Sequence, residues 1–279
     1  MPLDWSRYWH SGDRPLEAMH AHFERHVYHR HSHESYSFGV TETGAQSFRC
    51  RGGSYTSATG MVMAFNPDDP HDGHATDGLG FTYRMVHIGP DLVGDVLADR
   101  AGRTEGLPLF AEPVIDDALV ARHLHALHTA LLGGAPALRR DELLTATVAA
   151  LSRRAATTTP RPAGPRTSGE DTTRVADLAR RLIHDTYLED VNADDLAAAT
   201  GRTRYAVYRA FRSAYGMAPS DYQRQLRLRA ARRLITRGHP LSDVAARTGF
   251  ADQSHLTRWF VRYYGITPGG YRLALTDPP

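Results

Sequence analysis

Short runs of apolar and β-branched residues fill the first part of the chain. From about residue 22 to residue 115, Tyr, Phe, Val and Thr gather in stretches of a few residues, separated by glycines and by Asn66-Pro67. Such runs with turn residues between them are typical of the strands of a small all-β sandwich or barrel. The pattern predicts strands at residues 23–28, 37–43, 61–65 and 81–88, and a helix at residues 91–101.

The apolar period lengthens to that of a helix after residue 115. Leucines and valines recur three and four positions apart at residues 116–132 and again at 139–151, with Gly133-Gly134-Ala135-Pro136 between them. We therefore expect an antiparallel pair of helices. Residues 153–172 then mix Pro, Thr, Gly and Arg without an apolar period, which predicts a flexible linker. These breaks place the domains at residues 1–152 and 173–275.

The C-terminal part of the chain contains an internal repeat. Residues 196–201 reappear as residues 244–249, at an offset of 48. After one inserted residue the offset becomes 49, and it then pairs Arg209 with Arg258, Phe211 with Phe260, Tyr215 with Tyr264, Gly216 with Gly265, Pro219 with Pro268 and Tyr222 with Tyr271. Each copy has a short helix, a turn that contains glycine and a longer helix. This organisation predicts two helix-turn-helix units, which place two helices in DNA major grooves.

Local signals set the limits of the longer helices. Thr203 and Asp252 stand where N-caps are expected, and Gly216 stands where the first longer helix should stop. Between the two units, residues 221–237 read as one continuous helix that ends before Gly238. Its 17 residues span roughly 25 Å. A strut of this length can hold both longer helices on one side of the duplex, about one DNA turn apart.

One face of each longer helix is apolar, and the opposite face is polar. The apolar residues are Val207, Ala210, Phe211 and Ala214 in the first copy and Leu256, Trp259, Phe260 and Tyr263 in the second. The polar residues are Arg204, Tyr205, Tyr208, Arg209, Arg212, Gln253, Ser254, Thr257, Arg258 and Arg262. Arg can bind guanine with two hydrogen bonds, and Gln can bind adenine in the same way. A lone exposed helix also has such a face, but the repeat favours contact with DNA for the set.

Charge is divided unevenly along the chain. Residues 1–152 carry 12 Arg and 19 acidic residues, a net charge of −7, whereas residues 170–279 carry 17 Arg and 12 acidic residues, a net charge of +5. The basic half is thus the half with the repeat, as expected for a domain that approaches a polyanion. Cys50 is the single cysteine, so no disulfide can form within the chain. No export signal or membrane-spanning run is evident, and we expect a cytoplasmic protein.

The repeat region closely resembles the DNA-binding domain of AraC-type transcription regulators. The resemblance rests on residues 231–234, Val244-Ala245, 248–256, Phe260, 264–268 and Tyr271-Arg272. It implies a seven-helix domain with two helix-turn-helix units. It also implies that Arg204, Tyr205, Tyr208, Arg209, Gln253, Ser254, Thr257 and Arg258 face DNA.

The β-rich region resembles the cupin effector domain that often precedes this DNA-binding module. The resemblance rests on His31-Ser32-His33, Tyr36, Gly44, Gly60, Asn66-Pro67 and His71. Metal-binding cupins carry a Glu where this chain has Ser37 and Phe38. Three imidazoles can still bind a transition metal, with His74 as a substitute for His71. Because one ligand of the usual set is missing, we expect no metal, no cofactor and no catalytic residue.

Hydrogen bonding to a small organic effector is the use that we expect for this region. The candidate residues are His31, His33, Tyr36, His71, Tyr83 and Arg84. Arg84 could pair with an anionic ligand, or with a nearby carboxylate of the protein. Pocket-lining or sheet-stabilising roles for the histidines also stay open.

The sequence as a whole predicts an α+β multidomain chain: a cupin-like β-barrel with a helical pair, then an all-α domain with two helix-turn-helix units. We expect a sequence-specific DNA-binding transcriptional regulator whose promoter binding responds to a small-molecule effector. Its partners would be double-stranded DNA, the effector, a second copy of the chain joined through the helical pair, and RNA polymerase. Two alternatives remain: a metal-dependent cupin enzyme fused to a DNA-binding module, and a regulator that needs no effector.

Overall fold

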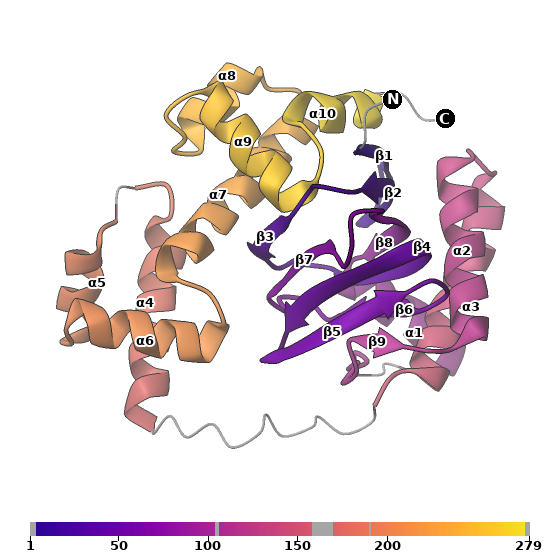
Figure 1. Ribbon diagram of the computed structural model, residues 1–279, viewed down its shortest axis with the longest axis horizontal. Coiled ribbons are helices and arrows are strands. Elements are labelled where there is room, and N and C mark those ends of the chain that lie inside the picture. Colours follow the sequence, from indigo (N-terminus) through magenta and orange to yellow (C-terminus); the bar gives the residue numbers. More distant parts are fainter. Residues whose placement is uncertain (1–3, 104–105, 158–169, 190, 277–279) are drawn as a thin grey trace. The chain divides into compact units, whose positions relative to one another are not determined.

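The computed structural model describes residues 4–103, 106–157, 170–189 and 191–276 (Figure 1). The chain divides into two compact units. The first comprises Met1–Val27, Ser32–Arg161 and Leu273–Pro279, and the second comprises Tyr28–His31 and Pro162–Arg272. We call them the sheet unit and the helical unit and describe each by itself. No described helix combines the length and the apolar character needed to span a bilayer.

An antiparallel sheet, nine-stranded in the described residues, forms the body of the sheet unit, although the residues of β3 are grouped with the helical unit. Its strands are β1 (Trp5–His10), β2 (Leu16–Phe23), β3 (Tyr28–His31), β4 (Tyr36–Cys50), β5 (Gly53–Ala58), β6 (Val62–Phe65), β7 (His71–Ala75), β8 (Phe81–Ile88) and β9 (Val114–Ile115). The main path runs β1-β2-β8-β4-β6-β9, while β5 and β7 pair with β4, and β3 pairs with β7. The first half of β4 pairs with β6 and β8, and its second half pairs with β5 and β7. This one long strand therefore connects the two parts of the sheet.

Among the described residues, the sheet unit also contains the helices α1 (Pro90–Ala101), α2 (Ala118–Leu132) and α3 (Ala137–Arg154). In Figure 1, α2 and α3 lie side by side against the sheet, as the predicted helical pair requires. Asp117 caps α2 by accepting hydrogen bonds from the amides of Leu119 and Val120. Their apolar faces share one core with the sheet, and its buried members include Val120, Leu124, Leu127, Leu144, Val148, Phe38 and Val86.

Two details of the predicted β region are wrong. Residues 23–28 do not form one strand, because β2 ends at Phe23 and β3 begins only at Tyr28. The amides of Glu24 and Arg25 instead donate to the Asp4 carboxylate, over 2.6 Å and 3.2 Å. The sheet also begins at Trp5 rather than near residue 22, since β1 pairs along its whole length with residues 17–22 of β2. Two buried positions of β2, 18 and 21, carry alanine, which has a low strand propensity, so the sequence gives only a weak strand signal there.

The helical unit contains seven helices in the residues that the structure describes. They are α4 (Glu170–Thr186), α5 (Ala193–Thr200), α6 (Arg204–Tyr215), α7 (Pro219–Thr236), α8 (Leu241–Arg247), α9 (Gln253–Tyr264) and α10 (Pro268–Thr276). The two copies of the repeat become α5-turn-α6 and α8-turn-α9. Thus the α+β multidomain class and the two helix-turn-helix units are confirmed.

The segment between the two units is described only at its ends. The helix α3 ends at Arg154 and α4 begins at Glu170, while residues 158–169 of the predicted linker lie outside the described residues. The domain boundaries expected at residues 152 and 173 stay predictions.

Candidate DNA-binding surface and histidine group

The helix α6 is limited by the two residues that the sequence indicated. The Thr203 hydroxyl accepts a hydrogen bond from the Ala206 amide over 3.2 Å, and Gly216 ends the helix with a φ of 68°. A left-handed φ of this kind favours glycine because a side chain would crowd the preceding carbonyl. Val207, Ala210 and Phe211 are buried on the inner face. The cap, the stop and the buried face together fix which side of α6 is exposed.

The outer face of α6 carries five exposed side chains, those of Arg204, Tyr205, Tyr208, Arg209 and Arg212. Arg204 binds the Asp194 carboxylate of α5 with two hydrogen bonds, one of them 2.6 Å long. The Arg209 guanidinium lies 5.7 Å from the centre of the Tyr205 ring, and Arg212 donates to the Tyr208 hydroxyl over 3.1 Å. These contacts hold long side chains in a defined array, so less conformational entropy is lost on binding a ligand.

The helix α9 repeats this design. The Asp252 carboxylate accepts from the His255 amide over 2.6 Å, and Gly265 ends the helix with a φ of 66°. Leu256, Phe260 and Tyr263 are buried, whereas Trp259, which we expected on the apolar face, is only half-buried. Two guanidinium groups contact its ring, those of Arg224 at 3.7 Å and Arg262 at 4.9 Å from the ring centre.

The expected polar face of α9 is accessible. Gln253, Ser254, Arg258 and Arg262 are exposed and Thr257 is half-buried. With the residues of α6, all ten candidate DNA-binding residues therefore lie on the accessible faces of equivalent helices. Their contact with DNA stays a prediction.

The helix α7 joins the two helix-turn-helix units. It contacts α4, α6, α8 and α9, and its 18 residues span about 27 Å. One arginine of α7 contacts the segment before the first helix-turn-helix unit and the turn of the second. The Arg227 guanidinium donates to the carbonyl oxygens of Tyr187 and Glu189 over 2.7 Å and 2.8 Å, and to that of Gly249 over 2.9 Å. Tyr187 and Glu189 precede the first unit, and Gly249 lies in the turn of the second. No signal in the sequence singles out Arg227.

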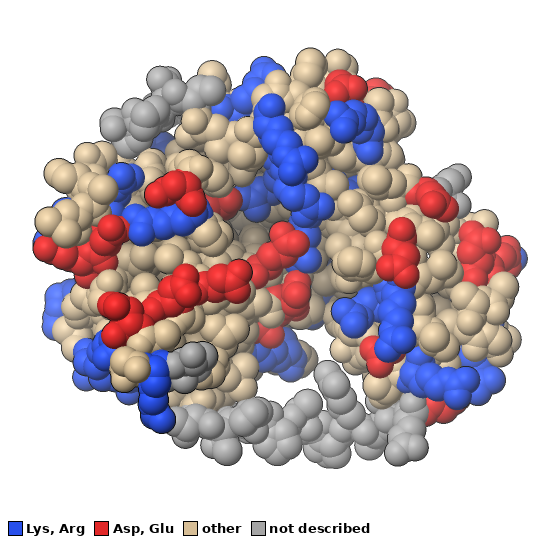
Figure 2. Space-filling model, turned by 180° about the vertical axis from the view of Figure 1, so that it is seen from behind, with Lys and Arg blue, Asp and Glu red and all other residues tan. Residues whose placement is uncertain are grey.

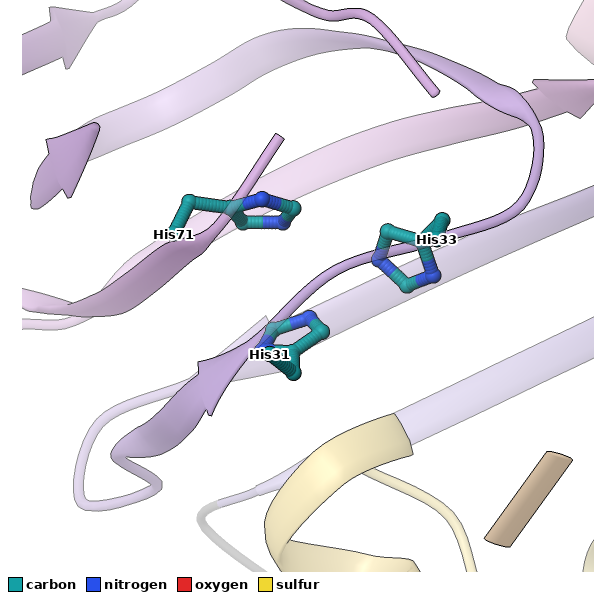
Figure 3. A group of neighbouring side chains, drawn as sticks. All are labelled: His31, His33 and His71. Atoms are coloured by element: carbon teal, nitrogen blue, oxygen red, sulfur yellow. The ribbon is translucent and has the colours of Figure 1, made fainter. Parts of the chain in front are cut away.

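Three of the expected effector-binding residues lie close together. His31 ends β3, His33 follows two residues later and His71 begins β7. Figure 3 shows the three rings directed toward a common space, and each offers a ring nitrogen that lies within 4.8 Å of the others. We call these three residues the histidine group. His31 and His71 are buried and His33 is half-buried. His74, the expected substitute, is exposed and lies outside the group.

The other three expected effector residues do not join the histidine group. Tyr36 is 2% exposed, donates to the Pro108 carbonyl over 2.7 Å and packs on Phe110; burial raises its pKa to about 12. Arg84 pairs with the Glu42 carboxylate, which is the alternative that the sequence left open. Tyr83 is buried against Phe81. Successive side chains of a strand point to opposite faces of the sheet, so consecutive residues such as Tyr83 and Arg84 cannot both face one site.

One residue near the histidine group was missed. His87 of β8 is buried, and its ring centre lies 4.6 Å from that of His33. Its Nδ1 lies 2.8 Å from the Ser37 hydroxyl, so the residue that stands at the expected Glu position binds an imidazole instead.

Comparison with known proteins places both halves of the chain. Residues 15–150 match the family of AraC-like ligand binding domains, and residues 196–274 match a helix-turn-helix domain family. The transcriptional regulator YbfI of Bacillus subtilis is 29% identical over 226 residues, which are 81% of this chain and 80% of YbfI. The transcriptional activator NphR of a Rhodococcus species is 38% identical over 104 residues, which are 37% of this chain and 30% of NphR. The chain belongs to the AraC-type family of transcriptional regulators.

A solved structure has the same two-part fold as this AraC-type regulator. The K231A variant of ToxT from Vibrio cholerae superposes with a TM-score of 0.53 at 9% identity, over 99% of this chain and 98% of ToxT. At this identity the match shows the fold alone. The expected order, an effector-binding domain and then a DNA-binding domain, is confirmed.

The charge division of this AraC-type regulator is visible on its surface. Figure 2 shows a row of acidic side chains crossing the sheet unit, in keeping with the net −7 of residues 1–152. A surface of this sign repels DNA, so the helical unit is the part that is suited to a polyanion.

A second histidine network links the sheet to α2. Burial lowers the pKa of His128 to about 3, so its ring is neutral; Nε2 lies 3.0 Å from the Met19 carbonyl oxygen and Nδ1 lies 3.1 Å from Nη1 of Arg84. Glu42 pairs with Arg84 and lies 2.7 Å from His20. Burial alone would raise the pKa of Glu42, but the hydrogen bonds from Arg84 and His20 outweigh it and lower that pKa. These residues tie α2 to the sheet.

Proposed function

We propose that this regulator binds operator DNA with the outer faces of α6 and α9, and that a small molecule held by the sheet unit changes promoter occupancy. The observation that supports the proposal is that α6 and α9 share the same arrangement of cap, stop and buried face. Two helices with equivalent caps and equivalent buried faces present arginine and amide groups on their accessible sides. Two such helices joined by α7 can enter successive major grooves.

The ten residues on these faces divide by chemistry. Arg209 and Arg258 occupy equivalent positions of the repeat and can each bind a guanine with two hydrogen bonds. Gln253 can bind adenine in the same way, and the remaining arginines can bind phosphates, which position the protein without reading sequence. Arg204 already has a carboxylate partner, so on DNA it would exchange Asp194 for a phosphate or keep it as a support.

Substitution of the two equivalent arginines tests the interface. We expect Arg209→Ala and Arg258→Ala each to weaken binding to the cognate site by about 1–3 kcal/mol, or roughly 5- to 150-fold. Arg100→Ala in α1 is the control, because Arg100 is exposed and lies outside α2, α3, α6 and α9. Duplexes selected from genomic fragments by the wild-type protein serve as probes in fluorescence anisotropy. Unchanged affinity in both variants would refute the assignment of the DNA-binding face.

The effector site is proposed on the side of the sheet that carries the histidine group. His31, His33 and His71 offer hydrogen-bonding nitrogens there, whereas Tyr36, Tyr83 and Arg84 would have to leave their present partners to contact the same ligand. A ToxT structure with an unsaturated fatty acid bound indicates that this fold is compatible with small-molecule ligands. A ligand with different affinities for two arrangements of the chain then shifts their populations.

The remaining partners follow from the same proposal. We expect a homodimer through α2 and α3, where Leu138 leaves 72% of its surface exposed near the start of α3. Contact with RNA polymerase and a cytoplasmic location complete the proposed function, and no catalytic residue is assigned. The enzyme alternative has no support in the relatives, which are transcriptional regulators. A regulator without an effector remains the competing hypothesis, and a search for compounds that change DNA affinity separates the two.

A further inference from the structure

A cavity of about 200 Å³ lies within the first helix-turn-helix unit and the helices beside it. Residues of α4, α5, α6 and α7, all in the helical unit, line it, and it is partly open to solvent. We call it the α4–α7 cavity. Most of its lining is apolar and includes Ile183, Val191, Leu196, Val207, Ala218 and Pro219. Side chains in protein interiors normally fill a space of this size, so the cavity needs an explanation.

Small side chains of the first copy of the repeat leave this space open. Ala193, Val207 and Ala218 line the cavity. The second copy carries a larger residue at each of the corresponding positions, namely Leu241, Leu256 and Thr267. An unfilled apolar cavity costs stability, because its lining loses packing contacts. The first copy thus keeps small residues at a cost that a bound molecule would offset.

The volume of the cavity suits one aromatic ring with a short polar group. A closed apolar cavity of about 150 Å³ takes up benzene, and the α4–α7 cavity is somewhat larger. Tyr208 also lines it, and the Tyr208 hydroxyl accepts a hydrogen bond from Arg212 over 3.1 Å. Aromatic rings pack favourably on one another in offset or edge-to-face arrangements. The lining therefore favours an aromatic occupant.

Two polar side chains give the cavity a hydrogen-bond donor and an acceptor. Within the described residues, Arg204 donates to the Asp194 carboxylate from Nε and Nη2, and its Nη1 is left for a ligand. Gln223 donates from Nε2 to the Glu189 carbonyl oxygen over 3.1 Å, so its Oε1 is left to accept. Because Asp194 already balances the charge of Arg204, a neutral group fits the cavity better than an anion does.

We propose that the α4–α7 cavity binds a small neutral aromatic molecule with an amide-like group, to which Arg204 donates and from which Gln223 accepts. The site lies in the helical unit and is separate from the effector site proposed in the sheet unit. Arg204 and Tyr208 also belong to the proposed DNA-binding face, so a bound molecule engages both side chains and lowers the affinity of α6 for DNA. This consequence rests on the proposed function, whereas occupation of the cavity does not.

Benzamide is the probe, and methyl NMR of the full-length chain labelled at isoleucine detects its binding. Of the five isoleucines, all within the described residues, Ile183 alone lines the cavity. Its methyl resonance should shift on titration with a dissociation constant on the order of 1 mM, while the other four stay in place. Benzoate has the same ring and a negative charge, and it should bind more weakly. Equal or tighter binding of benzoate would overturn the assignment of a neutral occupant.

Two filling variants show whether the shift arises from the cavity. Val207→Leu introduces the residue type of the second copy, and Ala218→Leu enlarges a side chain at a φ of −72° and a ψ of 153°, which suit any residue. Each should weaken benzamide binding by at least about tenfold. Ala199→Leu in α5 is the matched control, since Ala199 is exposed and does not line the cavity. It should bind benzamide as the wild type does.

Circular dichroism with thermal unfolding shows whether each variant is folded. An Ile183 methyl that does not shift in the wild type would overturn the proposal. So would equal benzamide affinity in the wild type and in a folded filling variant.

Fluorescence anisotropy with the cognate duplex tests the consequence for DNA binding. Saturating benzamide should weaken wild-type binding roughly fivefold or more and leave the binding of Ala218→Leu unchanged. Equal DNA affinity with and without benzamide, in wild-type protein whose Ile183 methyl has shifted, would refute the regulatory role. Failure of the proposed DNA-binding face is distinguishable, because Arg209→Ala and Arg258→Ala would then bind DNA normally while the methyl shift persisted.

Discussion

Arg227 contacts backbone groups near both helix-turn-helix units. Its substitution should therefore affect both the stability of the helical unit and the way in which α6 and α9 bind DNA together. It donates to three carbonyl oxygens, two before the first unit and one in the turn of the second, over 2.7–2.9 Å. We consider Arg227→Met, which keeps an unbranched apolar stem on α7 and removes every donor. The three carbonyls then have to find water or remain unpaired.

The magnitude follows from the hydrogen bonds. A bond to a charged group contributes about 1.5–3 kcal/mol, and the cost is larger where the abandoned acceptor stays buried. Glu189 and Gly249 are exposed, so water replaces much of what their carbonyls lose, and Tyr187 is half-buried. We therefore expect a loss of about 2–4 kcal/mol, well below the sum of three full bonds. The loss of stability in Arg227→Lys should lie between that of the wild type and that of Arg227→Met, because an ammonium group cannot reach the three acceptors as a planar guanidinium does.

Two assays distinguish stability from coordination. Urea unfolding of the full chain measures the free energy of unfolding. Fluorescence anisotropy on duplexes with both half-sites or with one reports how well α6 and α9 act together. Arg227→Met should lose more affinity for the two-site duplex than for the one-site duplex, since the turn of the second unit is no longer tied to the first. Arg233→Met, at an exposed position of the same helix, is the control. Equal unfolding free energy and equal two-site affinity in Arg227→Met and wild type would refute this reasoning.

Three further expectations concern other parts of the molecule. The pKa of His128, about 3 in the fold against 6.5 as the usual value, means that the unfolded chain binds more protons below pH 6.5. The contribution of His128 to the free energy of unfolding is therefore fully present above pH 6.5 and falls by about 2 kcal/mol at pH 5. Urea unfolding at pH 7.5 and at pH 5 measures this difference. No loss at pH 5 would contradict the burial of a neutral ring. Asp252→Ala removes the cap of α9, and thermal unfolding should show a cost of about 1 kcal/mol against a silent Ser242→Ala control. Leu138→Asp should shift the chain from dimer to monomer in sedimentation at equal concentration, and an unchanged mass would exclude α3 as the interface.

The helical unit was the more predictable half, because its signals are local. A cap, a stop and an apolar period lie within a dozen residues, so Thr203, Gly216 and Asp252 could be assigned from the sequence alone. Even the central helix, expected at residues 221–237, is found at Pro219–Thr236. What the sequence does not contain is the partner of a long side chain. Arg227 meets carbonyls 40 and 38 residues before it and 22 after it.

The sheet unit shows why a candidate site there could be predicted only in part. His31, His33 and His71 meet because β3 pairs with β7, whereas Tyr36 and Arg84 engage partners of their own. Which residues share a face depends on strand register, and β4 changes register against β8 between Thr41 and Thr43. The residue at this irregularity is Glu42, the carboxylate that binds Arg84. A bulge of this kind re-aims one side chain, and nothing in the local pattern marks it.

The two proposed reading faces differ in chemistry at equivalent positions of the repeat. Tyr205 and Tyr208 of α6 are 69% and 39% exposed, while Ser254 and Thr257 stand at the corresponding positions of α9. Two exposed aromatic rings on a helix surface gain most where they can leave water, and the thymine methyl groups in the major groove offer such apolar contact. Short hydroxyl side chains let the backbone of α9 approach base edges and phosphates more closely. An operator read by both helices is therefore expected to consist of two unlike half-sites, with the preference of α6 depending on its tyrosines.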